Sequence, residues 1–238
     1  MRALILNSGL GSRMGDETKT HPKCMTKIND KDTIISRQLK LLKRNGIKDI
    51  IITTGPFEDK LIDYCKSLNL GLNIKFINND IYKETNYIYS IYKAKEELND
   101  EIILMHGDLV FTNKVLKRVI NSKRSVVTVS STLPLPEKDF KAVIKNNKVD
   151  KIGIEFFDSA LSCQPLYKFN KKNWNLWLNN IIKYIDNGIC KCYAENALNE
   201  LKNKSLYPLD IKNELCGEID NLDDLERMKR MLKEVNYE

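Results

Sequence analysis

The first 25 residues combine glycines with two basic side chains in a spacing that could hold phosphate groups. A short apolar run, residues 3–6, leads into a loop that contains Gly9 and Gly11, and Arg13 and Lys23 follow. Glycines let backbone N–H groups approach an anion closely, and concave arrays of such groups bind phosphate. Arginine can grip phosphate through two parallel hydrogen bonds, and lysine adds a positive charge. The opening segment therefore predicts a buried strand that ends in a phosphate-binding loop.

Two better-known phosphate-binding motifs do not fit this spacing. The dinucleotide fingerprint Gly-x-Gly-x-x-Gly would need a glycine where the chain has Met14, and Gly15 comes one residue late. The second predicted strand ends in Thr-Thr-Gly at residues 53–55, with no acidic residue to hold a ribose. The P-loop sequence Gly-Lys-Ser/Thr is also absent. A plain strand-to-helix turn would explain the glycines but leave Arg13 and Lys23 without a role.

Carboxylates at two later points of the chain are candidates for holding a hard cation. Asp108 follows the apolar run 102–105, and ligands of open α/β sheets bind at the carboxyl ends of strands. Glu218 and Asp220 alternate, so on an extended segment they point to the same side. Mg²⁺ in proteins takes one or two carboxylates together with substrate phosphate oxygens. The competing interpretations are a simple Gly-Asp turn at Asp108 and helix capping next to Asp220.

These motifs together resemble the sugar-phosphate nucleotidyltransferase superfamily, whose signature is Leu-x-x-Gly-x-Gly-x-Arg-Met/Leu followed by Pro-Lys. Within it, the chain is most similar to small bacterial CTP:phosphocholine cytidylyltransferases and their relatives acting on aminoethylphosphonate or phosphoamino acids. The likeness covers nearly the whole chain, because it includes residues 85–92, 107–111 and 217–221. One departure lies at residues 7–9, where Asn-Ser-Gly stands in place of the Ala-Ala-Gly of many members. In the family that loop lies near the nucleotide base, so base selectivity is an open question.

The resemblance implies a Mg²⁺-dependent enzyme that transfers CMP from CTP to the phosphate or phosphonate of a small amine-bearing acceptor and releases pyrophosphate. It assigns Arg13 and Lys23 to catalysis. It assigns the metal to Asp108, Glu218 and Asp220. The helix face with Asn86 and Ser90 lines the nucleotide or acceptor site in the family, although capping and packing explain these two residues equally well. The expected nucleotide-binding residues are Asn7, Ser8, Gly9, Gly11, Ser12, Arg13, Asn86, Ser90 and Asp108.

The acceptor site is less clearly marked. A quaternary ammonium would require an aromatic box, for which Tyr167 and Tyr193 are candidates, with Glu195 as a counter-charge. Trp174 and Trp177 are further candidates, but their helical spacing is more typical of a core. The sequence Ser-Cys-Gln-Pro at residues 162–165 departs from the choline enzymes, so a primary amine or an amino-acid acceptor stays open. For Lys141 we expect a solvated side chain rather than a contact with the acceptor phosphate.

The length predicts one domain over residues 1–238, with a hairpin and helical insertion at residues 140–205, and the resemblance implies that it is a nucleotidyltransferase domain. The net charge of +7 is concentrated early, since residues 1–48 hold eleven Lys/Arg and four Asp/Glu. Such a local field suits a polyphosphate, and the aromatic pattern of single-strand nucleic-acid binding is missing. We expect no nucleic-acid partner, no membrane insertion and a cytoplasmic protein, with its six cysteines free.

Strand and helix patterns alternate in the first half, which predicts an α/β fold with a Rossmann-like, mostly parallel sheet and crossover helices, as in nucleotide-diphospho-sugar transferases. The second half begins with an antiparallel hairpin that turns at Asn146-Asn147. Predicted strands are 3–6, 49–53, 73–77, 101–106, 126–130, 140–145, 149–156 and 162–169. Predicted helices are 33–44, 57–68, 86–98, 172–185, 194–202 and one that Asn221 caps.

Two other functions fit part of the pattern. A sugar-1-phosphate nucleotidyltransferase shares the opening motif, although such enzymes are usually longer. A non-catalytic nucleotide-binding regulatory domain could keep the fold, but it would not need the carboxylates. The resemblance further implies that the product is used to decorate surface polysaccharide or lipid. Acceptor identity, strict preference for CTP and oligomeric state stay undecided.

Overall fold

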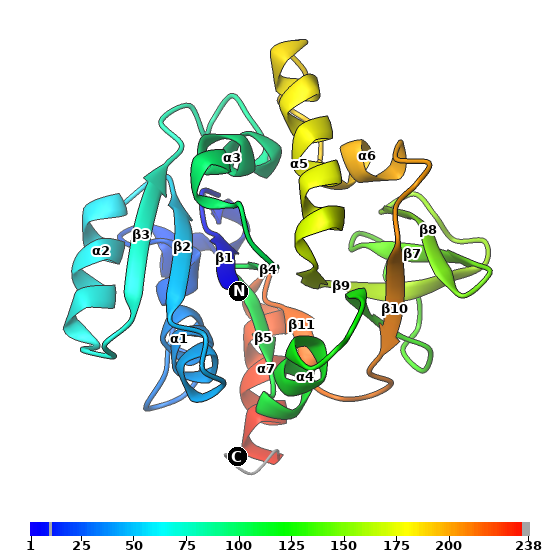
Figure 1. The fold of residues 1–238 in the computed structure, drawn as a ribbon. Helices are drawn as coiled ribbons and strands as arrows, with labels where there is room; N and C mark the ends of the chain where they lie inside the picture. The colour runs from blue at the N-terminus through cyan, green and yellow to red at the C-terminus, as the bar shows by residue number, and fades with distance from the viewer. Residues whose placement is uncertain (10, 235–238) are drawn as a thin grey trace.

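The computed structural model describes residues 1–9 and 11–234, and its strands and helices alternate through the first half of the chain (Figure 1). Within the described residues nine strands join in one mixed sheet, whose main path runs β10-β6-β9-β4-β1-β2-β3. The strands are β1 (Arg2–Leu6), β2 (Asp49–Thr54), β3 (Asn73–Asn78), β4 (Ile102–His106), β6 (Ser125–Ser130), β7 (Lys141–Lys145), β8 (Lys148–Gly153), β9 (Ala160–Phe169) and β10 (Leu206–Asp210). A separate two-stranded sheet pairs β5 (Leu109–Phe111) with β11 (Cys216–Glu218).

Four of the six pairings along this main path are parallel, so the central sheet is mostly parallel, as predicted. β1 runs parallel to β2 and β4, β2 runs parallel to β3, and β6 runs parallel to β10. β9 is antiparallel to both β4 and β6, and the hairpin of β7 and β8 extends from it. The hairpin region is therefore continuous with the central sheet through β9. The predicted fold class, mostly parallel α/β with an antiparallel hairpin, is confirmed.

The helices cover both sides of this sheet, and α5 and α6 stand together over β9 in Figure 1. They are α1 (Ile34–Arg44), α2 (Glu58–Ser67), α3 (Tyr87–Lys93), α4 (Asn113–Ile120), α5 (Lys171–Asp186), α6 (Ala194–Asn199) and α7 (Leu222–Glu234), with 3-10 segments η1 (Ser12–Thr18), η2 (Lys23–Met25) and η3 (Lys95–Glu97). Thr33 caps α1 in a capping box with Ser36, and Asn221 accepts a hydrogen bond from the backbone of Asp224 at the start of α7. The predicted cap at Asn221 is confirmed, and α1 begins at Ile34, one residue after the predicted start.

Five elements differ from the predictions, and one of them is β10, which the sequence analysis did not predict. The predicted helix 86–98 is interrupted at Ala94, so that α3 is short and η3 follows it. The strands β5 and β11 are three residues each, which is too short for an alternation pattern to show. The sequence analysis also missed α4, although Thr112 accepts the backbone hydrogen bond of an N-cap there.

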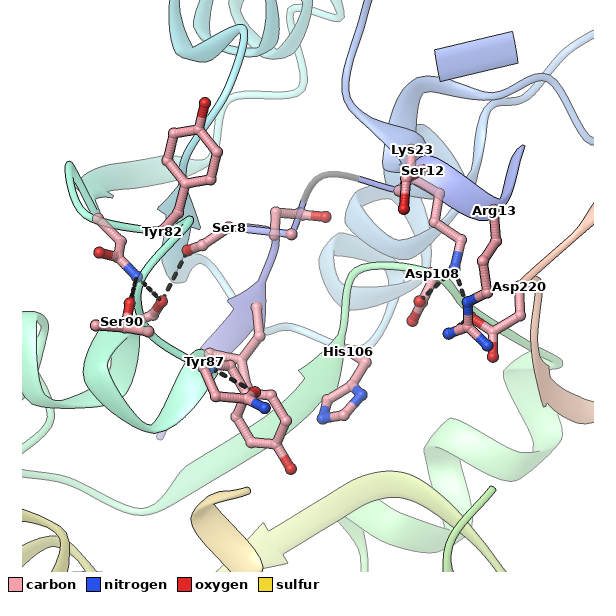
Figure 2. Close-up of a pocket in the computed structure, with 17 residues that line it drawn as sticks. Ser8, Ser12, Arg13, Lys23, Tyr82, Tyr87, Ser90, His106, Asp108 and Asp220 are labelled. Atoms are coloured by element: carbon pink, nitrogen blue, oxygen red, sulfur yellow. Dashed lines mark hydrogen bonds and ion pairs between the residues drawn. The ribbon is translucent and has the colours of Figure 1, made fainter. Parts of the chain in front are cut away.

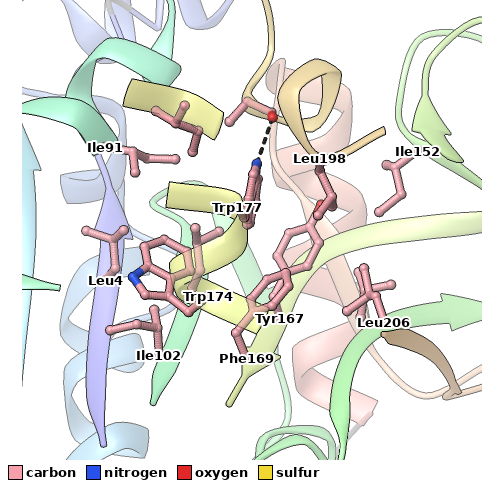
Figure 3. Packing of buried hydrophobic residues seen from close by; sticks show 14 of the residues in the cluster. Leu4, Ile91, Ile102, Ile152, Tyr167, Phe169, Trp174, Trp177, Leu198 and Leu206 are labelled. Atoms are coloured by element: carbon pink, nitrogen blue, oxygen red, sulfur yellow. Dashed lines mark hydrogen bonds between the residues drawn. The ribbon is translucent and has the colours of Figure 1, made fainter. Parts of the chain in front are cut away.

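The sheet is buried on both faces. Alternate residues of β1 point to opposite sides, so that Leu4 belongs to one apolar cluster and Ile5 to the other. Trp174 and Trp177 of α5 pack in the first cluster against Phe169 of β9 (Figure 3). A third cluster packs α7 against the β5–β11 sheet and the start of α1.

None of the helices in the described part of the chain combines the length and the apolar character that a membrane crossing requires.

Candidate active site

A cavity of about 380 Å³ lies at the carboxyl ends of β1 and β4 (Figure 2). This is the position at which open α/β sheets bind their ligands. The opening loop, the residues after β4 and the start of α3 form its wall. The lining residues are Leu6, Asn7, Ser8, Gly9, Gly11, Ser12, Arg13, Lys23, Asn79, Tyr82, Thr85, Asn86, Tyr87, Ser90, His106, Asp108 and Asp220.

The pairing of β1 with β4 brings the opening loop beside Asp108. Leu6 lies opposite His106, and the next residue, Gly107, donates its backbone N–H to the Leu6 carbonyl at 2.9 Å. A Cβ atom on Gly107 would lie 1.7 Å from Oδ1 of Asn7, so a larger residue here would force the Asn7 side chain to move. The Gly-Asp pair is therefore more than a turn, because it fastens the metal-ligand candidate to the phosphate-binding loop.

The small β5–β11 sheet brings the second carboxylate cluster to the same place. Glu218 lies opposite Leu109 in this antiparallel pair, and the Ile219 N–H donates to the Asp108 carbonyl at 3.1 Å. Asp220, the next residue, consequently faces Asp108 although the two are far apart in the sequence. The sheet topology thus joins the two carboxylate clusters that the sequence analysis selected.

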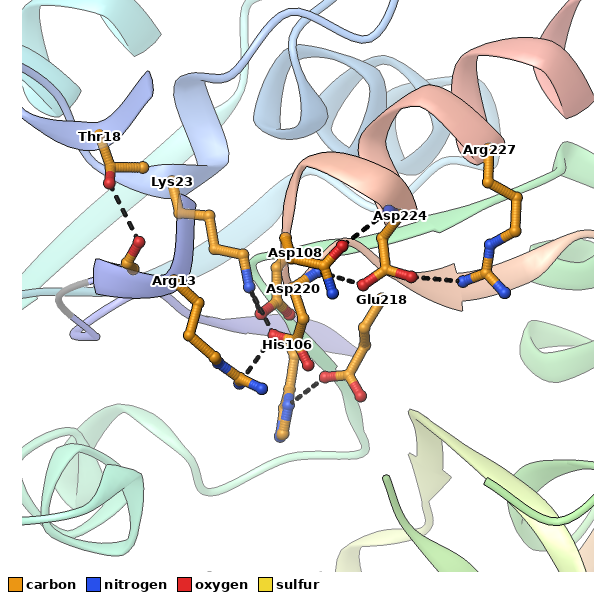
Figure 4. A network of polar contacts seen from close by, with 11 residues as sticks. Arg13, Thr18, Lys23, His106, Asp108, Glu218, Asp220, Asp224 and Arg227 are labelled. Carbon is orange, nitrogen blue, oxygen red and sulfur yellow. Dashed lines mark hydrogen bonds and ion pairs between the residues drawn. The ribbon is translucent and has the colours of Figure 1, made fainter. Parts of the chain in front are cut away.

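Two basic side chains meet this carboxylate pair (Figure 4). The Lys23 ammonium lies 2.8 Å from Oδ2 of Asp108 and 2.8 Å from Oδ1 of Asp220, and the Arg13 guanidinium lies 2.9 Å from the same Asp220 oxygen. Burial lowers the pKa of Lys23, but the two aspartates outweigh burial and raise it above its usual value. Arg13 is 65% exposed whereas Lys23 is 12% exposed. Lys23 is therefore a fixed charge of the site, and Arg13 can reach an incoming anion.

A second charged pair lies beside the first. Glu218 turns toward His106, with 2.9 Å between Oε1 and Nδ1. Burial lowers the pKa of His106, but Glu218 outweighs burial and raises it to about 9. Burial and the nearby Asp108 raise the pKa of Glu218 to about 7. Ligand atoms of His106, Asp108 and Glu218 all lie within 4.8 Å of one another, so Glu218 belongs to the same cluster without lining the cavity.

The opposite end of the cavity is uncharged. Asn86 caps α3 by accepting the Tyr87 N–H, and it also lines the cavity, so it combines the two roles that the sequence left open. Ser90, one turn further along α3, donates to the Ser8 hydroxyl at 2.9 Å. All the predicted nucleotide-binding residues line the cavity, although residue 10 between them lies outside the described residues.

Two of the three predicted acceptor residues are buried, and the third is exposed. Tyr167 and Glu195 are buried, at 0% and 1% exposure, behind the wall of the cavity. Their contact is a hydrogen bond of 2.8 Å between the tyrosine hydroxyl and the carboxylate, and the same carboxylate accepts a bond from the Tyr87 hydroxyl. Tyr193 is 37% exposed and stands next to Tyr87, with 6.0 Å between ring centroids. Tyr167 and Glu195 thus support Tyr87, which itself lines the cavity.

Four rings form a continuous aromatic surface beside the cavity. Tyr87 meets His106 edge-on at 4.9 Å between centroids, and Phe140 meets Tyr193 at 5.2 Å. His106 and Phe140 close the group at 6.3 Å. These rings come from α3, β4, the start of the hairpin and the start of α6. The insertion after β6 therefore supplies half of this surface.

Three other side chains that the sequence analysis discussed are buried. Trp174 and Trp177 are fully buried in the core, as their helical spacing favoured. The expectation of a solvated Lys141 is wrong. Its side chain is fully buried, and its ammonium donates to the carbonyls of Glu137 and Asp139 and lies 4.3 Å from the centre of the Phe157 ring. Carbonyl oxygens and an aromatic face replace the water that this charge would otherwise need.

Several lining residues were not predicted as site residues: Leu6, Asn79, Tyr82, Thr85, Tyr87 and His106. Thr85 and Tyr87 belong to the segment 85–92 that carried the resemblance, so a signal was present for them. His106 directly precedes Gly107-Asp108, but the sequence analysis did not select it. For Asn79 and Tyr82 the sequence held no signal, since they follow β3 in an irregular segment.

The chain is similar to nucleotidyltransferases in both sequence and structure. It is 26% identical over 245 residues to the choline-phosphate cytidylyltransferase of Streptococcus pneumoniae. This alignment covers 99% of this chain and 100% of the relative. It is 30% identical over 135 residues to the CTP:phosphoglutamine cytidylyltransferase of Campylobacter jejuni, covering 54% of this chain and 52% of the relative. The solved structure of the CTP:phosphocholine cytidylyltransferase from Streptococcus pneumoniae superposes with a TM-score of 0.76 at 23% identity, covering 97% and 98% of the two chains.

Fold, site and relatives define the class as nucleotidyltransferase, and the predicted resemblance and enzyme class are confirmed. Residues 19–188 match the family described as Domain of unknown function (DUF6564), and the chain belongs to that family.

Proposed function

We propose that the protein is a Mg²⁺-dependent cytidylyltransferase that transfers CMP from CTP to the phosphate or phosphonate of a small amine-bearing acceptor. The observation that carries this proposal is the meeting of Lys23 with Asp108 and Asp220 at the phosphate end of one cavity. The names of the two relatives above support CTP as the nucleotide and a phosphorylated small molecule as the acceptor.

The carboxylate cluster fits a magnesium ion. Asp108 and Asp220 already converge on one cationic group, and Oδ1 of Asp108 is buried without a hydrogen-bond partner among the described residues. Oxygen ligands from one or two carboxylates are what Mg²⁺ prefers. Asp108 and Asp220 would hold the ion with help from Glu218. When bound, it would supply positive charge that stabilises the oxygens of the α-phosphate.

The residues of this chain then have separate tasks. Backbone N–H groups of the opening loop hold the triphosphate, and Lys23 and Arg13 neutralise the charge that develops at the α-phosphorus. An oxygen of the acceptor forms a bond to this phosphorus, and the bond to the β-phosphate oxygen breaks, so that pyrophosphate leaves. A phosphate oxygen is already anionic at neutral pH, so no strong general base is required. Catalysis is therefore mainly positioning and charge stabilisation.

The acceptor binds against the aromatic surface in this proposal. Tyr87, His106 and Tyr193, with the buried Phe140 packed beside them, could receive a choline ammonium or the stem of an amino-acid acceptor, since aromatic faces attract cations. Glu195 acts from behind by fixing the Tyr87 hydroxyl. A quaternary ammonium, a primary amine and a phosphoamino acid all stay candidates.

Pyrophosphate release tests the proposal. The purified protein is incubated with CTP and Mg²⁺ and one acceptor at a time from phosphocholine, phosphoethanolamine, 2-aminoethylphosphonate, phosphoamino acids and sugar-1-phosphates. Release with one amine-bearing acceptor supports the proposal. Release only with sugar phosphates would make the protein a sugar-1-phosphate nucleotidyltransferase. If the protein binds CTP but releases no pyrophosphate with any acceptor, whether the nucleotide is CTP, UTP, GTP or ATP, it would instead be a regulatory nucleotide-binding domain.

A further inference from the structure

Four polar side chains form a hydrogen-bonded series at the uncharged end of the cavity. Nδ2 of Asn79 donates to Oγ1 of Thr85 and to Oγ of Ser90, both at 3.0 Å. Ser90 in turn donates to Oγ of Ser8 at 2.9 Å. Ser8, Ser90 and Asn79 are buried, and they come from the opening loop, α3 and the segment after β3. The mechanism above uses none of these hydroxyl groups.

The direction of this series is fixed by its far end. Thr85 donates its one hydroxyl hydrogen to the Ile81 carbonyl at 3.0 Å, so toward Asn79 it can only accept. The NH₂ side of the Asn79 amide must therefore face Thr85, and its second hydrogen goes to Ser90. Because Ser90 accepts there, its own hydrogen is the one that reaches Ser8. No reversal of the Asn79 amide keeps all these bonds.

The Ser8 hydroxyl is therefore left with a hydrogen to donate. Its oxygen accepts from Ser90, and within residues 1–9 and 11–234 no hydrogen bond is formed by its hydrogen. Ser8 lines the cavity at 7% exposure, and Figure 2 places it with Ser90 and Tyr82 across the cavity from Lys23 and Arg13. A hydroxyl that is buried with an unused hydrogen favours a ligand that brings an acceptor atom.

We propose that Ser8 is a specificity-determining donor that binds an acceptor atom of the pyrimidine base, held in direction by Asn79 and Ser90. This inference rests on the proposed function, which places the triphosphate at the Lys23 end and leaves the Ser8 end for the nucleoside. Cytosine offers two acceptors, the carbonyl O2 and the ring nitrogen N3, whereas its amino group can only donate. The departure from Ala-Ala-Gly at residues 7–9 thus adds a base contact that an alanine could not make.

The test compares the full-length wild type with Ser8→Ala and Ser90→Ala, with Ser67→Ala on the exposed end of α2 as the matched control. CTP affinity is measured by calorimetry, and KM and kcat by pyrophosphate release with the best acceptor. We expect Ser8→Ala to weaken CTP binding and raise its KM about 5- to 10-fold, the effect of one neutral hydrogen bond, with kcat within about twofold. Ser90→Ala should weaken binding less, because Ser8 keeps its hydroxyl but loses its direction.

Nucleotide analogues separate the base from the ribose. 3-Deaza-CTP lacks the N3 acceptor, 2-thio-CTP has a weaker acceptor at position 2, and 2′-deoxy-CTP changes only the sugar. For one base analogue the wild type should lose affinity while Ser8→Ala shows no further loss, as a double-mutant cycle requires for a direct contact. Equal losses in both proteins, or coupling to 2′-deoxy-CTP alone, would overturn the inference. Unchanged CTP binding by Ser8→Ala overturns it while the proposed function stands. A wild type that does not bind CTP overturns both.

Discussion

The Lys23 ammonium lies 2.8 Å from Oδ2 of Asp108, although 85 residues separate them in the sequence. The contact depends on β4 lying beside β1, which places the residues that follow each strand at the same edge of the sheet. Asp220 reaches the same ammonium by a different route, through β11 and its pairing with β5. Three separate segments of the chain therefore meet at one lysine.

Lys23→Ala and Asp108→Ala should each lower turnover by about 10² or more, because lost charge stabilisation of this kind costs a few kcal/mol. The measurement is kcat for pyrophosphate release at saturating CTP. Lys229→Ala is the matched control, since this lysine pairs with Glu226 on the surface of α7. Near-normal turnover in both site variants would refute the assignment.

Asp220→Asn should raise the Mg²⁺ concentration needed for half-maximal activity, because the amide oxygen carries no charge for the ion. The proposed metal requirement also predicts that EDTA stops turnover and that added Mg²⁺ restores it. A magnesium titration of wild type and variant measures both effects. Identical titration curves would remove Asp220 from the metal site and leave its contacts with Lys23 and Arg13 as its role.

The charged residues of this site were predicted from the sequence, whereas several uncharged residues that line the cavity were not. Arg13, Lys23, Asp108 and Asp220 were recognisable because phosphate and metal sites use few residue types near strand ends. Asn79 stands in an irregular segment that no periodicity marks, and its role depends on the tertiary contact with Ser90. Likewise, helix spacing and composition do not reveal burial of a polar side chain.

The burial of Lys141 was also not predictable from the sequence, although the strand that contains it was predicted. Its position in the hairpin strand was predicted, but alternation did not reveal that the preceding loop would fold over its ammonium. Tyr167 and Glu195 also lie in predicted elements, yet only the packing of α6 on the sheet places them behind the cavity wall. The sequence thus indicated the elements, whereas side-chain burial follows from how they pack.

The stability of the metal-free protein should fall as the pH rises from about 6.5 to 9. The pKa of His106 is raised from 6.5 to about 9 in the folded state. The stabilisation that protonated His106 gives is therefore fully present below pH 6.5 and is lost as the pH rises to about 9. Glu218 acts in the same direction at lower pH, since its raised pKa makes ionisation costlier in the folded state.

The experiment measures the free energy of unfolding by urea at several pH values in EDTA. His106→Asn should flatten the curve above pH 6.5, by no more than about 3 kcal/mol in total, the limit that the shift of the His106 pKa sets. A variant whose stability follows the wild type over this whole pH range would show that another group titrates.

Gly107→Ala should lower both stability and turnover, because the added Cβ would lie 1.7 Å from the Asn7 side chain. Relieving this clash means turning the Asn7 side chain, which lines the cavity, away from Gly107. Gly217→Ala is the matched control for stability, since a Cβ there meets its nearest neighbour, Met228, at an ordinary 3.5 Å. Thermal unfolding of both variants checks the difference, and equal melting temperatures would contradict it.

Trp177→Phe should destabilise the fold more than Trp174→Phe, although both side chains are fully buried in α5. Nε1 of Trp177 donates to the Ala194 carbonyl at 2.9 Å, whereas Nε1 of Trp174 is buried without a partner among the described residues.

Replacing Trp177 removes its hydrogen bond to the Ala194 carbonyl at the start of α6, which costs about 0.5–1.5 kcal/mol beyond the lost packing. Replacing Trp174 removes an unpaired N–H, so part of its packing loss is offset. Urea unfolding of the two variants measures the difference, and equal losses would mean that packing alone decides. Because α6 also carries Glu195, which bonds the Tyr87 hydroxyl, Trp177→Phe should in addition raise the KM of the acceptor without the same change for CTP.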